Sequence, residues 1–139
     1  MRERRILLVE DDPINSILVQ HILESEGYVV LKASTAEEVL MQIWATIPDL
    51  ILMDVQLPDL DGLTLTRMVR DNPSTSHITI VALTAYAMTG DREMALEMGC
   101  DGYISKPIDT KEFIRTVANF LESRTVKGDL SSEKGPRHR

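Results

Sequence analysis

Charged side chains follow several of the short apolar runs of this chain, at the points where those runs end. Glu10 and Asp11 follow the first run, Asp54 follows the third, and Lys106 follows the last. If the runs are neighbouring parallel strands, their carboxyl ends meet at one edge of a sheet, which is where open α/β sheets bind their ligands. The sequence therefore predicts one polar site built from acids and a lysine.

The acids of this predicted site suit a divalent cation. Carboxylates a few ångströms apart repel one another and raise each other's pKa unless a cation fills the gap. Mg²⁺ prefers oxygen ligands in octahedral geometry and usually takes one or two carboxylates. We expect Asp11 and Asp54 to be direct ligands and Glu10 to bind directly or through water. The backbone carbonyl of Gln56 is expected to complete the protein's share.

The remaining candidates suit a phosphoryl group. Lys106 offers a positive charge with three donors, and Thr84, after the fourth apolar run, offers a hydroxyl. Phosphoryl transfer is catalysed mainly by positioning and by charge neutralisation on the phosphoryl oxygens. A carboxylate can itself be the nucleophile and form an aspartyl phosphate. Asp54 is the expected nucleophile, because it is central in the predicted sheet and isolated in sequence from other acids.

Other polar residues have structural interpretations. Asp59 and Asp61 lie in a turn with Pro58, where aspartate favours turn formation, so we expect turn residues and not ligands. Cys100 lies beside a glycine and has no histidine near it in sequence, which favours an ordinary small residue over a reactive thiol. Tyr103, taken alone, is expected to be a half-buried strand residue.

The elements that must position these residues alternate regularly. Apolar runs of strand length alternate with helical periodicity five times, which is typical of a parallel α/β sheet covered on both faces by helices. The expected strands are about residues 5–9, 29–33, 50–53, 78–83 and 102–105. The expected helices begin after Asp12 and Thr35, run over about 62–70 and 88–98, and begin again after Asp109 or Thr110.

Helical periodicity also predicts which side chains the helices bury. The first helix is expected to bury Ile14, Ile17, Leu18, His21 and Ile22, the second Val39, Leu40, Ile43 and Trp44, and the fifth Phe113, Ile114, Val117, Phe120 and Leu121.

Length and charge indicate one domain with a distinct tail. A chain of 139 residues fits a single domain, which we place at residues 1–122. Residues 123–139 hold five Lys or Arg and two acids, which gives them a net charge of +3. The whole chain has a net charge of −7, so residues 1–122 carry −10. Such an acidic body is a poor DNA ligand, because binding a phosphate backbone needs clustered basic residues. The tail, with few apolar residues, is expected to be disordered.

Cysteine content and hydropathy bear on location. One cysteine excludes an internal disulfide, and the sequence has neither a signal-peptide pattern nor an apolar run of about 18 residues. We therefore expect a cytoplasmic protein without membrane insertion.

Four motifs together resemble the signature of response-regulator receiver domains. They are residues 9–12, residues 52–58 with 61–62, residues 82–85, and residues 102–107, and they occur in that order over about residues 5–122. The resemblance implies a flavodoxin-like fold, a doubly wound five-stranded parallel sheet of order 2-1-3-4-5 flanked by five helices. It is the agreement of four motifs at the family's spacing that makes it specific.

The resemblance also implies roles for single residues. Asp54 would accept a phosphoryl group from a histidine kinase or phosphotransfer protein, and Lys106 would contact a phosphoryl oxygen. Thr84 and Tyr103 would form a switch pair that changes the fourth helix, fifth strand and fifth helix, where a downstream effector binds. The implied Mg²⁺ ligands are Glu10, Asp11, Asp54 and the carbonyl of Gln56. A phosphorylation-dependent homodimer is compatible with the sequence.

Several alternatives are weighed against a stand-alone receiver. The chain could be the receiver of a hybrid histidine kinase. A Mg²⁺-dependent phosphatase of the haloacid-dehalogenase type needs a second aspartate two residues after the nucleophile, where this chain has Gln56. A nucleotide-binding module needs a glycine-rich loop after the first strand, and acids stand there instead. A degenerate receiver would lack polar residues that are present. We expect no enzyme activity beyond self-phosphorylation and self-dephosphorylation.

Overall fold

The structure is a computed structural model that describes residues 3–54, 59, 61–84, 91–105 and 108–130, with the backbone alone at residues 84, 91–92 and 123–130. Gln56 and Lys106, two of the predicted site residues, therefore lie outside the described part of the chain.

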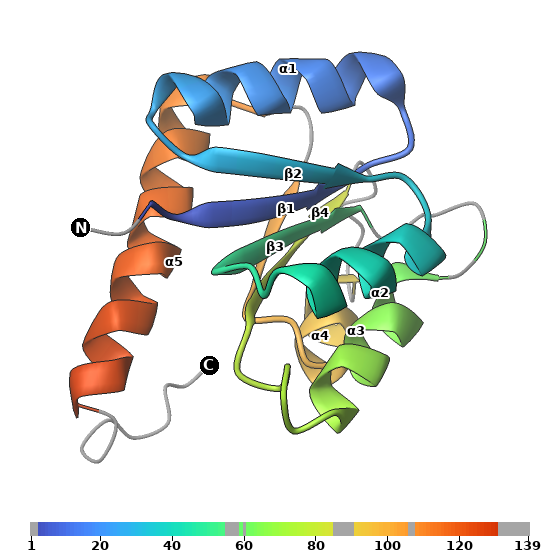
Figure 1. The fold of residues 1–139 in the computed structure, drawn as a ribbon. Coiled ribbons are helices and arrows are strands. Elements are labelled where there is room, and N and C mark those ends of the chain that lie inside the picture. The colour runs from blue at the N-terminus through green and yellow to red at the C-terminus, as the bar shows by residue number, and fades with distance from the viewer. Residues whose placement is uncertain (1–2, 55–58, 60, 85–90, 106–107, 131–139) are drawn as a thin grey trace.

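Five strands alternate with five helices along the chain (Figure 1). The strands are β1 (Arg5–Val9), β2 (Val29–Ala33), β3 (Leu50–Asp54), β4 (Thr79–Thr84) and β5 (Gly102–Ser105). The helices are α1 (Pro13–Ser25), α2 (Ala36–Ala45), α3 (Gly62–Asp71), α4 (Asp91–Glu97) and α5 (Thr110–Leu130). All strand pairs are parallel, in the order β2-β1-β3-β4-β5. The predicted fold class is confirmed.

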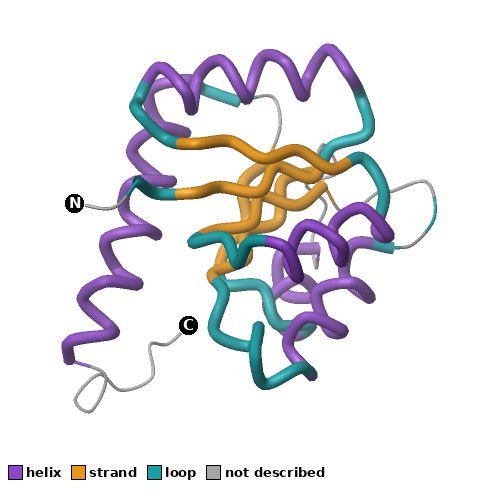
Figure 2. The backbone as a smooth tube through the Cα atoms, viewed as in Figure 1, coloured by secondary structure: helices purple, strands orange, loops and turns teal. Residues whose placement is uncertain are grey.

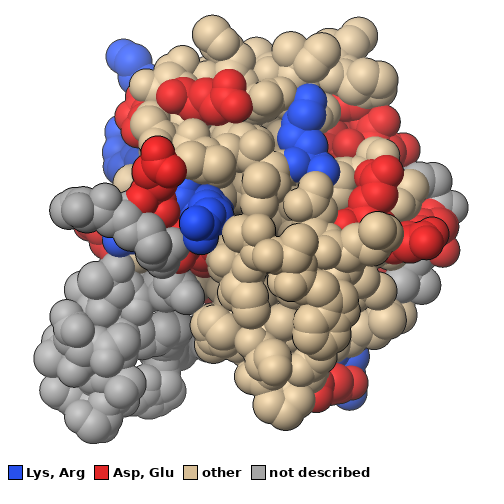
Figure 3. Space-filling view, in the orientation of Figure 1, with Lys and Arg blue, Asp and Glu red and all other residues tan. Residues whose placement is uncertain are grey.

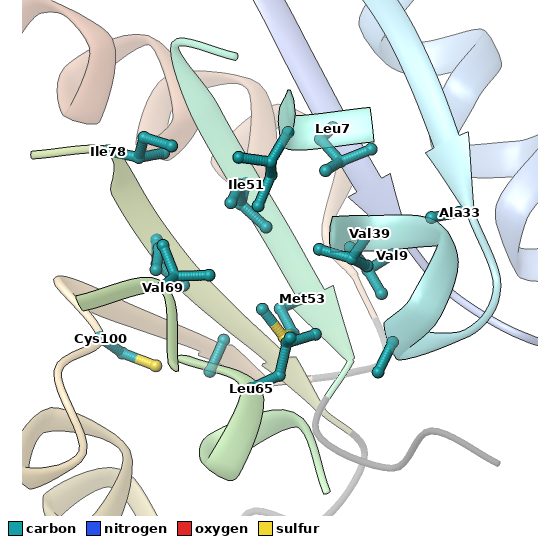
Figure 4. Packing of buried hydrophobic residues seen from close by; sticks show 14 of the residues in the cluster. Leu7, Val9, Ala33, Val39, Ile51, Met53, Leu65, Val69, Ile78 and Cys100 are labelled. Carbon is teal, nitrogen blue, oxygen red and sulfur yellow. The ribbon is translucent and has the colours of Figure 1, made fainter. Parts of the chain in front are cut away.

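Helices lie on both faces of the sheet (Figure 2). Because side chains alternate along each strand, the sheet separates two apolar layers. Ile6 and Leu8 of β1 belong to a buried cluster that includes residues of α1 and α5. Leu7 and Val9 point to the other face, where they join a cluster that includes residues of α2, α3 and α4. Figure 4 shows this second cluster, with Met53 beside Leu65. Both faces are covered by helices, which explains why the strands are almost continuously apolar.

The first three helices begin where the sequence predicts them to begin. Asp12 caps α1 by accepting a hydrogen bond from the Ile14 amide, and Pro13 fills the first helical position. Thr35 caps α2 through the Glu38 amide. Asp61 caps α3 through the Leu63 amide at 3.3 Å. Local capping chemistry therefore sets where these helices leave the sheet edge.

Two of the predicted buried stripes are only partly right: Ile22 of α1 and Val39 and Ile43 of α2 are buried as predicted, but other members are not. In α1 the side chains of Ile14, Ile17, Leu18 and His21 are exposed, and the buried residues are Ser16, Val19, Ile22 and Leu23. Apolar residues lie around most of this helix, so periodicity alone does not determine which side faces the sheet. In α2, Trp44 is 67% exposed, because Ala36, Val39 and Ile43 already form the line of contact and Trp44 lies about 100° beyond it.

Helix α5 follows the prediction at its start and departs from it at its end. Phe113, Val117 and Leu121 are buried, as expected. The helix then continues to Leu130, so the backbone of residues 123–130 is helical where we expected disorder. Extending an existing helix costs far less than starting one, and no proline interrupts this stretch. In the part of the chain that the structure describes, no helix has the length and apolar character needed to cross a membrane.

Candidate metal and phosphoacceptor site

Strand register brings the two buried acids of the site together. Val9 of β1 pairs with Met53 of β3. Glu10 and Asp54 are the next residues of these adjacent parallel strands, so both emerge at the carboxyl edge of the sheet. Glu10 also donates its amide to the Ala33 carbonyl of β2 at 3.0 Å, which continues the ladder by one residue. Backbone pairing on both sides of β1 thus fixes where the Glu10 side chain leaves the sheet.

Three carboxylates converge at this edge. Glu10, Asp11 and Asp54 each offer an oxygen, and these oxygens all lie within 4.8 Å of one another. Glu10 is 4% and Asp54 7% exposed, whereas Asp11 is open to solvent. Two oxygens bound to one Mg²⁺ lie roughly 3 to 4.2 Å apart, since each Mg–O bond is about 2.1 Å long. Small side-chain rotations would therefore bring all three acids onto one ion, and this donor set fits Mg²⁺.

Asp12, the third acid of residues 10–12, orients the site without joining the cluster. Its carboxylate accepts hydrogen bonds from the Ile14 amide at 3.0 Å and from the Asn15 side chain at 3.2 Å. Its own amide donates to Glu10 Oε2 at 3.2 Å. Asp12 therefore fixes the start of α1 and one oxygen of Glu10, while Asp11 between them remains available to a cation.

The sheet places the backbone of Thr84 at the same edge. Asp54 pairs with Leu83, so Thr84, the last residue of β4, lies one position further toward the edge. Thr84 in turn pairs with Ser105, the last residue of β5. Lys106 follows Ser105 directly in sequence. Tyr103, two residues before the end of β5, pairs with Ala82 and is half-buried against the cluster that α3 and α4 also cover.

The surroundings of the acids are open and negative. A cleft of about 300 Å³ runs beside Glu10 and Asp11 and is also lined by Lys32 and Glu38. Acidic side chains gather at the right of the view in Figure 3, which is the side toward which the strands of Figure 1 point. A concentration of one sign of charge in a cleft raises the local concentration of counterions. A cation that enters this cleft therefore meets Glu10 and Asp11.

Sequence reasoning missed two residues that join distant segments: Asp59, which binds the start of α2, and Arg70, whose partners precede β4 and β5 at the edge of the sheet opposite the acids. Asp59, expected to be a turn residue, accepts hydrogen bonds from the amides of Ala36 and Glu37 at the start of α2. Arg70 of α3 forms an ion pair with Asp101 at 2.7 Å. Both contacts join segments more than 20 residues apart, and no local pattern in the sequence signals either of them.

Comparison with known proteins agrees with this geometry. Residues 6–118 match the family of response regulator receiver domains. A polar-differentiation response regulator, DivK of Brucella ovis, is 39% identical over 118 residues, which cover 85% of this chain and 96% of that protein. The chain therefore belongs to the response regulator receiver domain family.

Solved structures support the same assignment. A putative response regulator from Chloroflexus aurantiacus is 34% identical, with a TM-score of 0.83 over 87% of this chain and 99% of that one. The receiver domain of the sensor histidine kinase PA1611 from Pseudomonas aeruginosa is 36% identical, with a TM-score of 0.80 over the same shares. That structure holds a magnesium ion coordinated in its active-site cleft.

Proposed function

We propose that this receiver domain accepts a phosphoryl group on Asp54 from a histidine kinase or phosphotransfer protein, with Mg²⁺ bound by Glu10, Asp11 and Asp54. The observation that carries the proposal is the convergence of these three carboxylates at the ends of β1 and β3. The carbonyl of Gln56 is the fourth protein ligand in the proposal.

The chemistry assigned to the site is an in-line displacement. A carboxylate oxygen of Asp54 attacks the phosphorus of a phosphohistidine, the P–O bond forms, and the P–N bond breaks with the electron pair leaving on the imidazole. When bound, Mg²⁺ would neutralise charge on the phosphoryl oxygens. Lys106 would neutralise another oxygen, and the Thr84 hydroxyl would donate to a third. No reaction with external substrates is part of the proposal.

The phosphodonor is proposed to dock on α1. Three apolar side chains of its first two turns, Ile14, Ile17 and Leu18, are exposed, with Ile14 at 76%. They follow the acid cluster directly in sequence. Clustered exposed apolar side chains mark contact surfaces in soluble proteins. A donor protein seated on them would bring its phosphohistidine to the open side of the site, beside Asp11.

The output side of the proposal is a switch read by a downstream effector protein. Phosphorylation would draw the Thr84 hydroxyl toward the phosphoryl group and change the position of Tyr103, a two-state response to a local charge change. The half-buried position of Tyr103 on the edge strand β5, beside α4 and α5, supports this role. We propose that an effector protein binds there, in the cytoplasm, and that the domain does not bind DNA directly. A homodimer of the phosphorylated protein is one form of this binding.

Phosphorylation of purified protein tests the central claim. With a small phosphodonor such as phosphoramidate and Mg²⁺, the wild type should gain one base-labile phosphate, and Asp54→Asn should gain none. Asp71→Asn is the matched control, because Asp71 is an exposed acid at the far end of α3. Mg²⁺-dependent phosphorylation that persists in Asp54→Asn would contradict the assignment of Asp54. Repeated release of phosphate from aryl phosphate esters would instead support a phosphatase.

The direction of phosphoryl flow is a separate part of the proposal. The relatives include both a response regulator and a receiver domain of a sensor histidine kinase. A response regulator passes its signal to an effector, whereas the receiver of a hybrid kinase passes its phosphoryl group to another histidine. We propose that this chain acts as a response regulator and passes its signal to an effector. Rapid transfer from phosphorylated Asp54 to a phosphotransfer protein, in preference to hydrolysis, would support the hybrid-kinase alternative.

A further inference from the structure

A lysine of β2 lines the same cleft as two acids of the proposed metal site. This cleft, of about 300 Å³, lies where the starts of α1 and α2 meet the end of β2. Glu10 and Asp11 line one part of it, and Lys32, the next-to-last residue of β2, lines another. Among the described residues that line the cleft, Lys32 is the only basic one. One positive charge therefore borders the space from which a cation reaches these carboxylates.

Strand pairing fixes the position of Lys32. It pairs with Leu8 of β1, two residues before Glu10. Side chains of paired residues leave a sheet on the same face, so Lys32 lies on the face where Leu8 packs in the cluster that includes residues of α1. The Lys32 carbonyl also accepts a hydrogen bond from the Gln42 side chain of α2 at 3.3 Å. The backbone is thus held on two sides, while the exposed side chain borders the cleft.

No direct contact neutralises the Lys32 ammonium. Within the described part of the chain, it has neither an ion pair nor a hydrogen-bond partner. Glu38, an exposed acid of the same cleft, instead accepts hydrogen bonds from the Ser34 amide at 2.7 Å and the Ser34 hydroxyl at 3.1 Å. The bond from the Ser34 amide lowers the pKa of Glu38 below its usual value. Lys32 therefore keeps its charge in the cleft without a paired acid.

The size of the cleft gives the range over which this charge acts. A cleft of this volume is about 8 Å across, and charges at such a separation interact even in a solvent-exposed setting. A monovalent cation at that range should weaken the binding of a divalent one by about threefold at low salt. The effect should nearly vanish at high salt, because the screening length then becomes shorter than the cleft.

We propose that Lys32 is an affinity-determining residue of the metal site, whose unpaired ammonium repels Mg²⁺ across the cleft and weakens its binding. The inference rests on the proposed Mg²⁺ site at Glu10, Asp11 and Asp54. Weaker binding raises the Mg²⁺ concentration at which phosphorylation of Asp54 reaches half its maximal rate. A lysine that served solubility alone would leave both quantities unchanged when its charge is removed.

Three variants separate the local charge from other effects. Lys32→Met removes the charge, keeps a long side chain and adds no oxygen that could itself bind Mg²⁺. Lys32→Arg keeps the charge. Arg67→Met is the matched control, because Arg67 is an exposed cation of α3 outside the cleft and its loss changes the net charge of the chain by the same amount. Circular dichroism without Mg²⁺ checks that each variant folds.

Isothermal titration calorimetry with Mg²⁺ on the full chain tests the inference. In about 0.05 M KCl, Lys32→Met should bind Mg²⁺ about threefold more tightly than the wild type, and in about 0.5 M KCl the two should bind nearly equally. Lys32→Arg and Arg67→Met should bind as the wild type does at both salt concentrations. The Mg²⁺ concentration for half-maximal phosphorylation by phosphoramidate should fall in Lys32→Met by the same factor.

The outcomes distinguish this inference from the function on which it rests. If the wild type binds Mg²⁺ and is phosphorylated, but Lys32→Met has unchanged Mg²⁺ affinity, the role of Lys32 is wrong and the proposed function stands. Equal tightening in Lys32→Met and Arg67→Met would assign the effect to overall charge and would also overturn the inference, as would a gain in affinity that persists at high salt. A wild type that neither binds Mg²⁺ nor accepts phosphate would overturn both proposals.

Discussion

Replacing Arg70 by methionine should destabilise the protein strongly, although the Arg70 side chain is partly exposed. The Arg70 guanidinium donates to the carbonyls of Gly99 at 2.9 Å, Ser76 at 2.8 Å and Ile78 at 2.6 Å, and to Asp101 Oδ2 at 2.7 Å. These partners belong to three separate segments: the end of α4, the loop after α3, and the entry to β5. One side chain thus joins all of them to α3.

The structure sets the size of the expected loss. Methionine keeps most of the aliphatic stem, so the change removes hydrogen bonds and charge with little loss of packing. Breaking a buried ion pair from one side costs about 3 to 5 kcal/mol. The side chains of this pair are 19% and 21% exposed, and the Ser76 carbonyl lies in an exposed contact, so water replaces part of what is lost. We therefore expect about 3 kcal/mol less free energy of unfolding, and a Tm lower by about 10 °C.

Urea unfolding followed by circular dichroism measures the effect, and a double-mutant cycle apportions it. Asp101→Asn removes the charge of the partner, and the coupling free energy with Arg70→Met should be about 1 kcal/mol. Arg70→Lys keeps the charge on a single donor atom and should recover less than half of the loss. A decrease below about 1 kcal/mol in Arg70→Met would refute the reasoning, because it would mean that water satisfies the exposed carbonyls without cost.

Three further predictions concern single contacts. Burial raises the pKa of the Cys100 thiol to about 11, so its reaction with a disulfide reagent at pH 8 should be slow in the folded protein and fast in urea. A methyl group at Gly102 would overlap a phenylalanine ring of α5, so Gly102→Ala should lower the free energy of unfolding by about 1 to 3 kcal/mol; Gly27→Ala, at φ +93° with open space around it, should cost only about 1 kcal/mol of backbone strain. The hydrogen bond from the Ser34 amide lowers the pKa of Glu38 below its usual 4.5, so its stabilising effect is complete above pH 4.5 and is lost as the pH falls through the lowered value; the difference in urea midpoint between wild type and Glu38→Gln should shrink from pH 7 to pH 3.

The sheet and the cluster of Glu10, Asp11 and Asp54 were predictable because the signals for them are local. Each strand reads as a short apolar run, and parallel strands bring the residues that follow them to one edge. Glu10 and Asp54 therefore meet because each of them directly follows an apolar run that is predicted to be a strand. The caps Asp12, Thr35 and Asp61 accept hydrogen bonds from amides within three residues of themselves. Asp12 and Thr35 were therefore predictable as local helix caps, and Asp61 was predictable as a turn residue.

The rotation of the helices was less predictable than their position. The apolar residues of α1 form two overlapping stripes, and the one that includes Val19 and Leu23 faces the sheet, while Ile14 and Leu18 face solvent. Packing against β1 and α5 determines which stripe of α1 is buried, and the sequence of α1 alone does not specify that packing. The same holds for Trp44, whose exposure depends on where Val39 places the helix on the sheet.

Contacts between distant segments were not predictable from the sequence at all. Asp59 and Asp101 look like ordinary loop acids, and the partners they bind lie 21 to 31 residues away. A backbone amide as a donor leaves no trace in residue type, so the Asp59 bonds to α2 cannot be read from composition or periodicity. The geometry of the fold alone brings these groups within hydrogen-bond distance.

The exposure of Trp44 limits how well intrinsic fluorescence can follow changes in this protein. It is the only tryptophan of the chain, and 67% of its surface already meets solvent in the folded state. Its emission should resemble that of indole in water both before and after denaturation, and it lies on a helix that ends away from the acidic cleft. Native tryptophan fluorescence would therefore report weakly on denaturation and on binding in the acidic cleft. An optical signal requires a new tryptophan at a position whose surroundings change.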